Sequence, residues 1–340
     1  MGIQLSKLVE QKEIRLDDLK DRVLVVDSMN MLYQFLTTLR MADGTPLSDE
    51  KGNITAHLVG ILSRVTGLVE KGIKLVFVFD GAAPLLKKEE RERRQKVKED
   101  ATEKYEIAKE RGDIAEMRKY AQMTTKIDKK VIDDSKRLLD LLGFPIIQAP
   151  SEGEAQCAHI VKRGDADFVV SQDFDVFLFG APKVVRNLTL SQYKKKGQKG
   201  TEITRVDLTD VLKSLEITNE QLIILGILVG TDFNRGGIKG IGPMKGLKLV
   251  KEYKDRYDAL FSELNWKDNF DFSWKEVYEI FDNIPVTDNY SIKWKRIDEE
   301  GLRTFLIGER NFSEERVNSA IEKISKGNPK NQKRLADFFG

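Results

Sequence analysis

Three aspartates stand at the ends of apolar stretches, in positions from which their carboxylates can meet: Asp27, Asp80 and Asp173. Each apolar stretch has the length and composition of a buried strand. The carboxyl ends of parallel strands face one crevice, so we expect the three side chains to lie near one another. Carboxylate oxygens are the ligands that Mg²⁺ and Mn²⁺ prefer. The spacing therefore predicts an acidic cation site.

Two further aspartates extend this set. Asp175 lies two residues beyond Asp173, and in an extended chain both side chains point to one side while Phe174 points to the other. Asp232 follows a helix predicted over Leu222–Val229. Each aspartate also has a simpler interpretation, because Asp is common in turns and as the capping residue before a helix.

Glu152 and Glu154 are two more candidates, and the residues alone leave their role open. Ser151 and Glu154 fit a helix capping box. Side chains two residues apart also diverge inside a regular helix, so the glutamates can converge only at an irregular helix start. Structural capping and metal binding both remain consistent with the pattern.

A crowd of acids has an energetic cost that points to bound cations. Two carboxylates about 5 Å apart repel by roughly 3 kcal/mol at an effective dielectric near 20. Several acids in one crevice would destabilise the fold unless metal ions compensated them. The chain has only His57, His159 and the single cysteine Cys157, a set that argues against a zinc site and excludes an intramolecular disulfide.

The elements around these acids alternate between strands and helices. Strands are predicted over Val23–Val26, Leu75–Phe79, Pro145–Gln148, Phe168–Ser171, Val176–Phe179 and Lys183–Asn187. Helices are predicted over Met29–Arg40, Asn53–Lys71, Ile132–Leu142, Ala155–Arg163 and Leu222–Val229. This alternation predicts an α/β fold with a mostly parallel central sheet and helices on both sides.

The segment 87–130 interrupts this pattern with Lys, Arg, Glu and Gln and few large apolar residues. Such a composition predicts one or two long polar helices that protrude from the core. A solvated helical hairpin without a further role is the alternative. Its first part has an excess of cations although the net charge of the whole chain is only +2. Segregated positive charge of this kind favours a polyanionic partner.

A glycine-rich segment, GGIKGIGP at Gly236–Pro243, is a second candidate for phosphate binding. Gly240 and Gly242 permit close backbone approach, and Pro243 suits the first turn of a helix whose N–H groups can bind phosphate. The nearby cations are Lys239, Lys245 and Lys248. A purely structural helix–loop–helix is the alternative.

The last residues form an apolar group, because Leu335, Phe338 and Phe339 fall on one helical turn. Exposed apolar side chains of this kind predict an anchor for a partner protein, with folding of the tail onto its own domain as the alternative. No apolar run approaches the roughly 20 residues of a membrane span. The start, MGIQLSKL, has no secretory apolar region.

Five blocks together resemble the conserved segments of flap endonucleases of the XPG type: VVDSMNMLYQFL, FVFDGAAPLLK, APSEGEAQCAHI, VVSQDFDVFLFG and LVGTDFNRGGIKGIGP. The likeness covers nearly the whole chain, and its lack of a basic extension after Gly340 is similar to the archaeal branch. It implies a PIN-like 5′-nuclease fold with a helical arch and a C-terminal helix–two-turn–helix region. Arg235 and Met244 depart from the family, which often has proline and lysine there.

The resemblance assigns roles by position. It implies nuclease regions at 1–98 and 131–220, an arch at 87–130, DNA-binding helices at 221–327 and a clamp-binding tail at 328–340. Two Mg²⁺ ions, replaceable by Mn²⁺, would serve two-metal hydrolysis. The implied ligands are Asp27, Asp80, Glu152 and Glu154 for the first ion, and Asp173, Asp175 and Asp232 for the second.

The resemblance also implies the residues that hold DNA. Lys87 and Arg94 match positions that stabilise the scissile phosphate. Tyr33 matches a residue that stacks on a base, although a core tyrosine is an equal alternative from pattern alone. Arg64 matches a duplex contact, and K⁺ is expected at the glycine-rich segment. The tail resembles a box that docks on the sliding clamp (PCNA), through Gln332, Leu335, Phe338 and Phe339.

These implications together predict a monomeric, magnesium-dependent flap endonuclease with 5′–3′ exonuclease activity. Its substrate would be branched DNA with a 5′ flap, in Okazaki-fragment processing and repair. We expect it in the nucleoid-associated cytoplasm of an archaeon, or in the nucleus of a eukaryote, and not at a membrane. The alternatives are an exonuclease or bubble-cutting nuclease of the same superfamily, and a catalytically silent, clamp-tethered DNA-binding factor.

Overall fold

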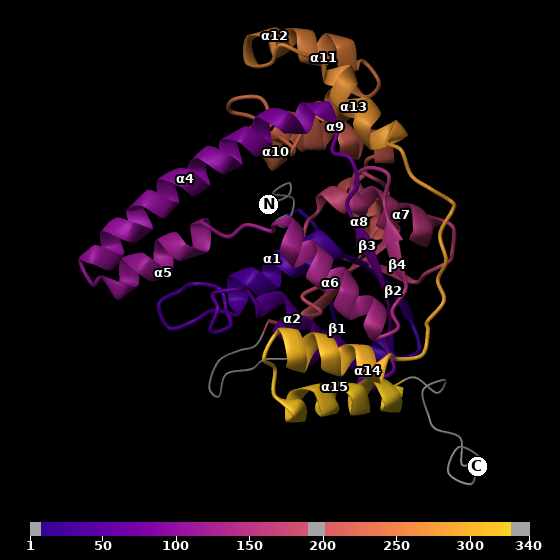
Figure 1. Cartoon of the computed structure of the whole chain (residues 1–340). Coiled ribbons are helices and arrows are strands. Elements are labelled where there is room, and N and C mark those ends of the chain that lie inside the picture. Colours follow the sequence, from indigo (N-terminus) through magenta and orange to yellow (C-terminus); the bar gives the residue numbers. More distant parts are fainter. Residues whose placement is uncertain (1–7, 190–200, 328–340) are drawn as a thin grey trace.

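A seven-stranded sheet forms the centre of the computed structural model, which describes residues 8–189 and 201–327 (Figure 1). Its order is β1-β7-β6-β5-β2-β3-β4. The strands are β1 (Lys12–Ile14), β2 (Val23–Asp27), β3 (Lys74–Phe79), β4 (Ile146–Gln148), β5 (Phe168–Val170), β6 (Lys183–Arg186) and β7 (Ile203–Asp207). Neighbours from β6 to β4 run parallel, while β7 is antiparallel to both β6 and β1. The predicted mostly parallel sheet is confirmed.

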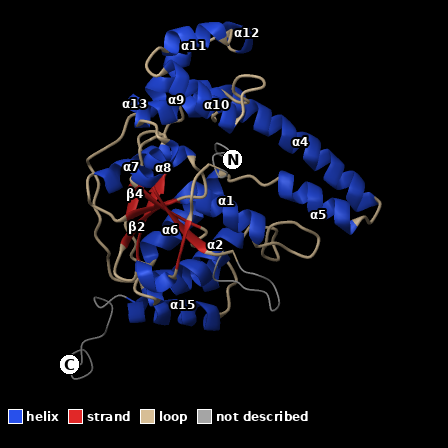
Figure 2. Ribbon diagram, turned by 180° about the vertical axis from the view of Figure 1, so that it is seen from behind, coloured by secondary structure: helices blue, strands red, loops and turns tan. Residues whose placement is uncertain are grey.

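Side chains from the two faces of this sheet enter two separate cores. On β2, Val25 belongs to one buried cluster, whereas Leu24 and Val26 belong to the other. The same alternation holds on β3, where Val76 and Val78 lie opposite Leu75, Phe77 and Phe79. Successive side chains of a strand point to opposite faces, so continuous apolar runs are what a strand covered on both sides requires. Figure 2 shows the strands enclosed by helices.

Helices from the first half of the chain cover one face and part of the other. Asp27 ends β2 and caps α1 (Ser28–Thr38). The next helical stretch comprises α2 (Ala56–Gly60), a π-helical turn η2 (Ile61–Val65) and α3 (Thr66–Glu70), while α6 spans Lys129–Leu141 and α7 spans Gly153–Lys162. Short 3₁₀ turns are η1 (Leu16–Leu19), η3 (Leu85–Lys87) and η4 (Asp175–Phe177). Gly72 and Gly143 adopt positive φ at helix ends.

Two helices project away from the sheet and are called the arch here: α4 (Lys88–Glu110) and α5 (Ile114–Met123) (Figure 1). They pack along each other, with Ala101 and Ala108 of α4 and Ala121 of α5 fully covered. Alanines at these positions permit a close approach, while most of the remaining α4 surface is polar. The prediction of protruding polar helices is confirmed.

After β7, the described chain contains helices and no strand. It contains α8 (Leu208–Leu215), α9 (Asn219–Val229), α10 (Pro243–Tyr253), α11 (Tyr257–Glu263), α12 (Trp266–Asn269), α13 (Trp274–Asn283), α14 (Glu299–Leu302), the π-helical turn η5 (Arg303–Glu309) and α15 (Glu314–Gly327). Helix α9 is buried on all sides and lies beside α10 and α13. Helix α15 returns to pack on α3 at the opposite end of the molecule (Figure 1).

Two local predictions were wrong. Val176–Phe179 was expected to be sheet, but Asp175–Phe177 is a 3₁₀ turn whose side chains are nevertheless buried. An apolar run of four residues has the same appearance in a buried turn as in a strand. The edge strand β1 and its neighbour β7 were missed, because both carry charged residues and β1 has only three residues. Within the described ranges, no helix is long and apolar enough to cross a bilayer.

Candidate active site

The ends of β2 and β3 bring the first acids together. Asp27 is buried, and one of its carboxylate oxygens accepts the backbone N–H groups of Met29 (3.0 Å) and Asn30 (3.2 Å). Asp80 follows β3, and its Oδ1 accepts the N–H of Gly153 at 2.7 Å. A Cβ at Gly153 would lie 2.6 Å from that oxygen, so a glycine is required for this close approach. Asp27 is therefore both a helix cap and a member of the acidic group.

Glu152 and Glu154 lie where helix α7 starts. Glu152 is the extended N-cap residue (φ −70°, ψ 131°), and Glu154 is in the first turn. The predicted capping box is absent, because the Ser151 hydroxyl donates to the carbonyl of Ala82 instead. Glu154 accepts a 3.3 Å hydrogen bond from Ser171 at the end of β5. The irregular helix start that convergence requires is present.

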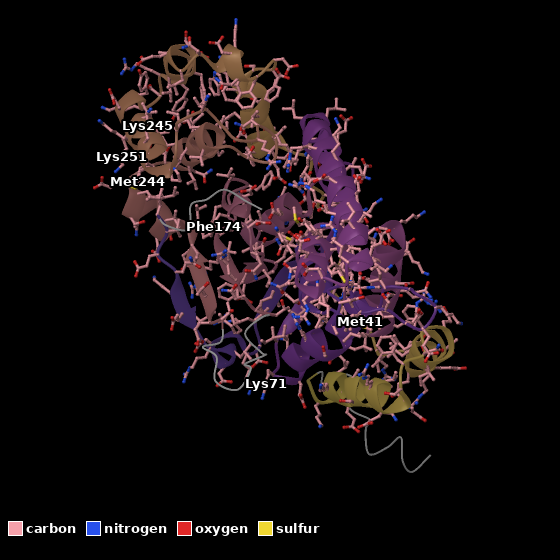
Figure 3. The ribbon with its side chains drawn as sticks, turned by 90° about the vertical axis from the view of Figure 1, so that its left-hand side faces the viewer. Met41, Lys71, Phe174, Met244, Lys245 and Lys251 are labelled. Atoms are coloured by element: carbon pink, nitrogen blue, oxygen red, sulfur yellow. The ribbon has the colours of Figure 1, made fainter. Side chains whose placement is uncertain are left out.

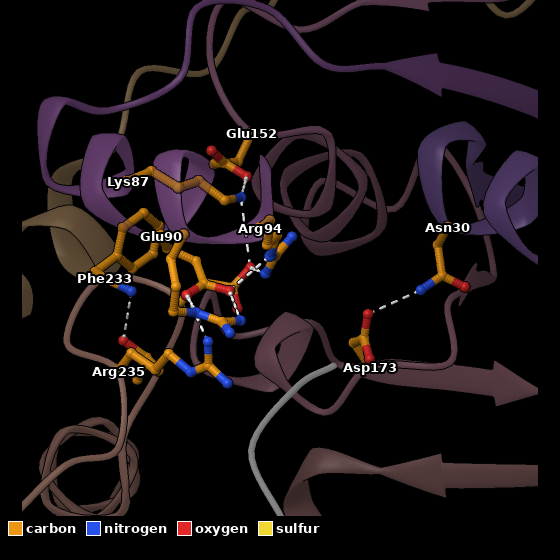
Figure 4. Close-up of polar contacts among 11 residues, drawn as sticks. Asn30, Lys87, Glu90, Arg94, Glu152, Asp173, Phe233 and Arg235 are labelled. Carbon is orange, nitrogen blue, oxygen red and sulfur yellow. Dashed lines mark hydrogen bonds and ion pairs between the residues drawn. The ribbon is translucent and has the colours of Figure 1, made fainter. Parts of the chain in front are cut away.

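Asp173 and Asp175 follow β5, but not in an extended chain. Phe174 has helical φ and ψ, and Asp175 begins the 3₁₀ turn. The premise that both side chains share one side of an extended strand is therefore wrong. Both carboxylates nevertheless act electrostatically on Glu154, and Asp173 also acts on Asp27. Asp173 accepts a 2.9 Å hydrogen bond from the Asn30 side chain of α1 (Figure 4).

The base of the arch supplies cations to the same place. Lys87 Nζ lies 2.5 Å from Glu152 Oε2 and 3.9 Å from Asp232 Oδ2. Arg94 Nη2 lies 2.7 Å from Asp232 Oδ2 (Figure 4). Burial alone lowers the pKa of both cations, but the neighbouring acids outweigh it and raise the pKa above its ordinary value. Both side chains remain charged near the acidic group.

Burial and mutual repulsion raise the pKa of two of these carboxylates. Burial, followed by the charges of Asp80 and Asp173, raises the pKa of Asp27 to about 8. Burial and the charges of Asp27, Asp173 and Asp175 also raise the pKa of Glu154. The thiol of Cys157 lies behind these acids, and burial together with Asp27 and Glu154 raises its pKa, so it stays protonated. A cation bound among these acids would therefore stabilise their ionised forms.

The donor set suits Mg²⁺ or Mn²⁺, because it is made entirely of carboxylate oxygens. Among the described residues, no three His, Cys, Asp or Glu side chains are grouped as they would be around an ion. Local partners account for this: Asp27 and Asp80 accept backbone N–H groups, and Glu152 and Asp232 bind the arch cations. A metal ion would have to replace the cations on Glu152 and Asp232.

Sequence reasoning missed Glu90, which lies one turn from Lys87 on α4. Its side chain is buried and accepts hydrogen bonds from Arg93, Arg94 and Arg235. Inside a run of charges it looked like one solvated acid among many. The departure of Arg235 from the family pattern was the signal that could have drawn attention to this place.

The predicted DNA contacts differ in their exposure. Tyr33 is 46% exposed on α1, so the core interpretation is wrong and its ring is available to a ligand. Arg64 is only 5% exposed, with its guanidinium over the Phe35 ring and 3.3 Å from the Thr38 hydroxyl. Its role as a duplex contact stays a prediction, and its burial counts against it.

The glycine-rich segment forms a loop and helix start as predicted. Gly236, Gly237 and Gly240 have positive φ, and Gly242 is the N-cap of α10 with Pro243 in its first turn. Within the described part of the chain, no side-chain cap hydrogen bond forms at this helix start. Lys239, Lys245 and Lys248 are exposed. Figure 3 shows Met244, Lys245 and Lys251 at one edge of the molecule.

The predicted clamp-binding residues Gln332, Leu335, Phe338 and Phe339 lie outside the described residues.

Comparison with known proteins identifies the family. The sequence profile of the XPG N-terminal domain matches residues 1–101, and that of the XPG I-region matches residues 143–232. Flap endonuclease 1 of Pyrococcus abyssi is 48% identical over 330 residues, which cover 96% of this chain and 94% of the relative. Flap endonuclease 1 of Thermococcus onnurineus is 45% identical and covers 100% of this chain and 99% of its own.

Solved structures show the same fold. Flap endonuclease-1 from Methanococcus jannaschii superimposes with a TM-score of 0.76 at 38% identity, over 96% of this chain and 98% of that one. The catalytic core of Rad2 in complex with DNA substrate has a TM-score of 0.68 at 24% identity, over 92% and 96% of the two chains, a likeness of fold alone. The chain belongs to the flap endonuclease family of XPG-type structure-specific nucleases.

Proposed function

We propose that this chain is a magnesium-dependent flap endonuclease that hydrolyses a DNA phosphodiester at the base of a 5′ flap. A 5′–3′ exonuclease activity of the same site leaves 5′-phosphate products, in Okazaki-fragment processing and repair. The observation that supports the proposal is the electrostatic coupling among buried acids of separate elements, together with the ion pairs that Lys87 and Arg94 of the arch base make with Glu152 and Asp232.

The acids fall into two groups that would each hold one Mg²⁺ or Mn²⁺ ion. Asp27, Asp80, Glu152 and Glu154 would hold the first, and Asp173, Asp175 and Asp232 the second. When bound, the two ions lower the pKa of a water and stabilise charge on the attacking and leaving oxygens. The raised pKa of Asp27 and Glu154 supports this assignment, since a cation beside them would offset both the burial that mainly raises it and the added repulsion from neighbouring acids.

Lys87 and Arg94 would bind the scissile phosphate once it enters. In the protein without DNA they pair with Glu152 and Asp232. With a metal ion held by these acids, Lys87 and Arg94 would be available to a phosphate as their new anionic partner. Held charge of this kind stabilises a transition state without reorganisation at the moment of reaction.

The rest of the surface supports a duplex held beside this site. Tyr33 can stack on a base whatever its identity, an interaction worth about 1–3 kcal/mol. Gly240, Gly242 and the first N–H groups of α10 would contact a phosphate, together with Lys239, Lys245 and Lys248. A potassium ion bound by carbonyls of this loop belongs to the same proposal. Binding should weaken steeply with salt.

A cleavage panel tests the proposal directly. Labelled 5′-flap, nick, gap and bubble substrates are incubated with Mg²⁺, with EDTA and with the Asp173→Ala variant. Cutting at the flap base with Mg²⁺ alone supports the proposal. Preferential cutting of bubbles or ends would favour another nuclease of the superfamily, and branched-DNA binding without cutting would favour a silent DNA-binding factor.

The tail and the place of action complete the proposal. Gln332, Leu335, Phe338 and Phe339 would dock a monomer of this chain on the sliding clamp (PCNA), in the nucleoid-associated cytoplasm that its archaeal relatives suggest. Replacing Phe338 and Phe339 together by Ala should leave intrinsic cleavage intact and remove stimulation by the clamp. Equal stimulation of variant and parent contradicts this part.

A further inference from the structure

Glu90 lies at the centre of an ion-pair group at the base of the arch. Its carboxylate is 2.6 Å from Arg94 Nε, 3.0 Å from Arg93 Nε and 3.1 Å from Arg235 Nη1. Only 7% of Glu90 is exposed, although it belongs to the most polar helix of the chain. An ionised carboxylate has about four acceptor positions, so three guanidinium groups can be satisfied at once.

This group joins the arch to the loop that follows α9. Arg94 bridges Glu90 and Asp232, whose Oδ2 is 2.7 Å from Arg94 Nη2, and Arg235 returns from the same loop to Glu90 (Figure 4). Side-chain hydrogen bonds hold the conformation of this loop. The Thr231 hydroxyl donates to Asn234 Oδ1 at 2.7 Å, and the Asn234 side chain donates to the carbonyl of Ile227 at 2.7 Å.

We propose that Glu90 is a positioning residue that holds Arg94 at the active site, and that its pair with Arg235 fastens the base of the arch to the C-terminal helices before DNA binds. The consequence for cleavage rests on the proposed function. The effect on amide hydrogen exchange at the base of the arch does not depend on the proposed function.

The double contact of Arg94 explains why Glu90 is needed. Asp232 is one of the acids that would bind metal, and an ion there competes with Arg94 for its oxygens. Glu90 lies outside the acidic group and keeps its hold on Arg94 Nε when Asp232 is taken. The Arg94 guanidinium would therefore stay beside the proposed phosphate position and would not turn away from the active site into solvent.

The pair with Arg235 is a tie between two parts of the molecule that are far apart in sequence. The Arg235 side chain is 49% exposed and reaches the Glu90 side chain, which is only 6% exposed. A residue without a donor at position 235 would remove this tie and leave the pairs of Glu90 with Arg93 and Arg94 on its own helix.

Amide hydrogen exchange without DNA or metal tests the tie independently of cleavage. The variants are Glu90→Gln, Arg235→Gln and the double variant. The matched control is Asp100→Asn, which removes an exposed ion pair with Lys104 on the same helix. We expect exchange at the start of α4 to rise about fivefold in each single variant, a typical coupling between paired residues. The double variant should exceed the singles little, and the control should match the parent.

Exchange within twofold of the parent in both single variants, or effects that multiply fully in the double variant, would overturn the proposal. Arg235→Gln alters a half-exposed side chain and so keeps the test valid if Glu90→Gln does not fold. Arg235→Lys, which retains the charge, should restore most of the protection. A failure to restore it would also count against an ion-pair tie.

Cleavage kinetics test the positioning of Arg94. On a 5′-flap substrate with Mg²⁺, Glu90→Gln should lower kcat about tenfold and leave KM within twofold, whereas Asp100→Asn should change neither. An unchanged kcat, or a loss confined to KM, contradicts the role assigned to Glu90. If the parent itself cuts no flap, the proposed function fails while the exchange experiment still decides the tie.

Discussion

Replacing Lys87 by Met tests two roles that we propose for one cation. Lys87 Nζ is 2.5 Å from Glu152 Oε2, and the two side chains are 17% and 8% exposed. Lys87 is thus the partner that a metal ion must displace from Glu152, and the cation that would later face the phosphate. Lys87→Met keeps the length of the side chain and removes both functions.

The two effects have opposite signs, and the effect on cleavage is the larger one. A unit charge about 4 Å from a developing charge contributes about 4 kcal/mol at an effective dielectric near 20. Its loss lowers the cleavage rate about 1,000-fold. A hydrogen bond to a charged group contributes about 1.5–3 kcal/mol. Without it, Glu152 is free to bind a divalent ion, and Mn²⁺ should bind about 10- to 100-fold more tightly.

Single-turnover cleavage of a labelled 5′ flap measures the first effect, and calorimetric titration of DNA-free protein with Mn²⁺ measures the second. Lys104→Met is the matched control, because it removes an exposed cation from α4, the helix that begins directly after Lys87. A Lys87→Met rate within threefold of the parent, or weaker Mn²⁺ binding, would refute the reasoning.

Three further predictions concern the acids, the glycine loop and a buried histidine. Asp173→Ala should abolish Mg²⁺-dependent cleavage and preserve binding of branched DNA in gel-shift assays, whereas Asp140→Ala, which removes an exposed ion pair, should cleave normally. Gly237→Ala should lower the unfolding free energy by about 2–3 kcal/mol in chemical denaturation, because its Cβ would lie 2.3 Å from the Leu228 carbonyl at φ +56°; Gly236→Ala, with open space around it, should cost about 1 kcal/mol. Burial lowers the pKa of His57 to about 4, and its ring nitrogens have no hydrogen-bond partner among the described residues. The neutral ring is therefore favoured in the folded state, and about 3 kcal/mol of stability should be lost as pH falls from about 6.5 to 4. His57→Leu should lack this component of the pH dependence of unfolding, and an unchanged slope would contradict it.

The sequence was most informative where one physical rule decides the outcome. Asp27 and Asp80 end strands whose continuous apolar residues could only be buried on both faces, so their place at one edge of the sheet could be predicted. Gly72 and Gly143 end helices for the same kind of local reason. The polar arch could be predicted because few of its residues suit a core.

The remaining features depend on contacts between distant residues. Glu90 resembles the other acids of α4 until Arg235, far along the chain, is placed beside it. The burial of Arg64 depends on Phe35 and Thr38 of another helix. The turn at Asp175 replaces a strand with equally apolar residues, so its composition gave no warning. Tertiary packing decides such cases, and local propensity does not.

In the protein without DNA, the ion pairs with the arch cations compensate some of the acids and leave others uncompensated. Lys87 and Arg94 compensate Glu152 and Asp232, whereas Asp27 and Glu154 remain under strong repulsion. Divalent ions would therefore enter between acids that already lack positive charge, and would release two cations toward the substrate. Metal binding would thus come first and would make Lys87 and Arg94 available to the DNA phosphate.

Anomalous diffraction from crystals soaked in Mn²⁺ measures the position of the ions directly. We expect two peaks, one among Asp27, Asp80, Glu152 and Glu154 and one among Asp173, Asp175 and Asp232, with Lys87 displaced from Glu152. Crystals in which the acids keep their backbone caps and arch cations, and in which no Mn²⁺ peak lies between them, would contradict the account.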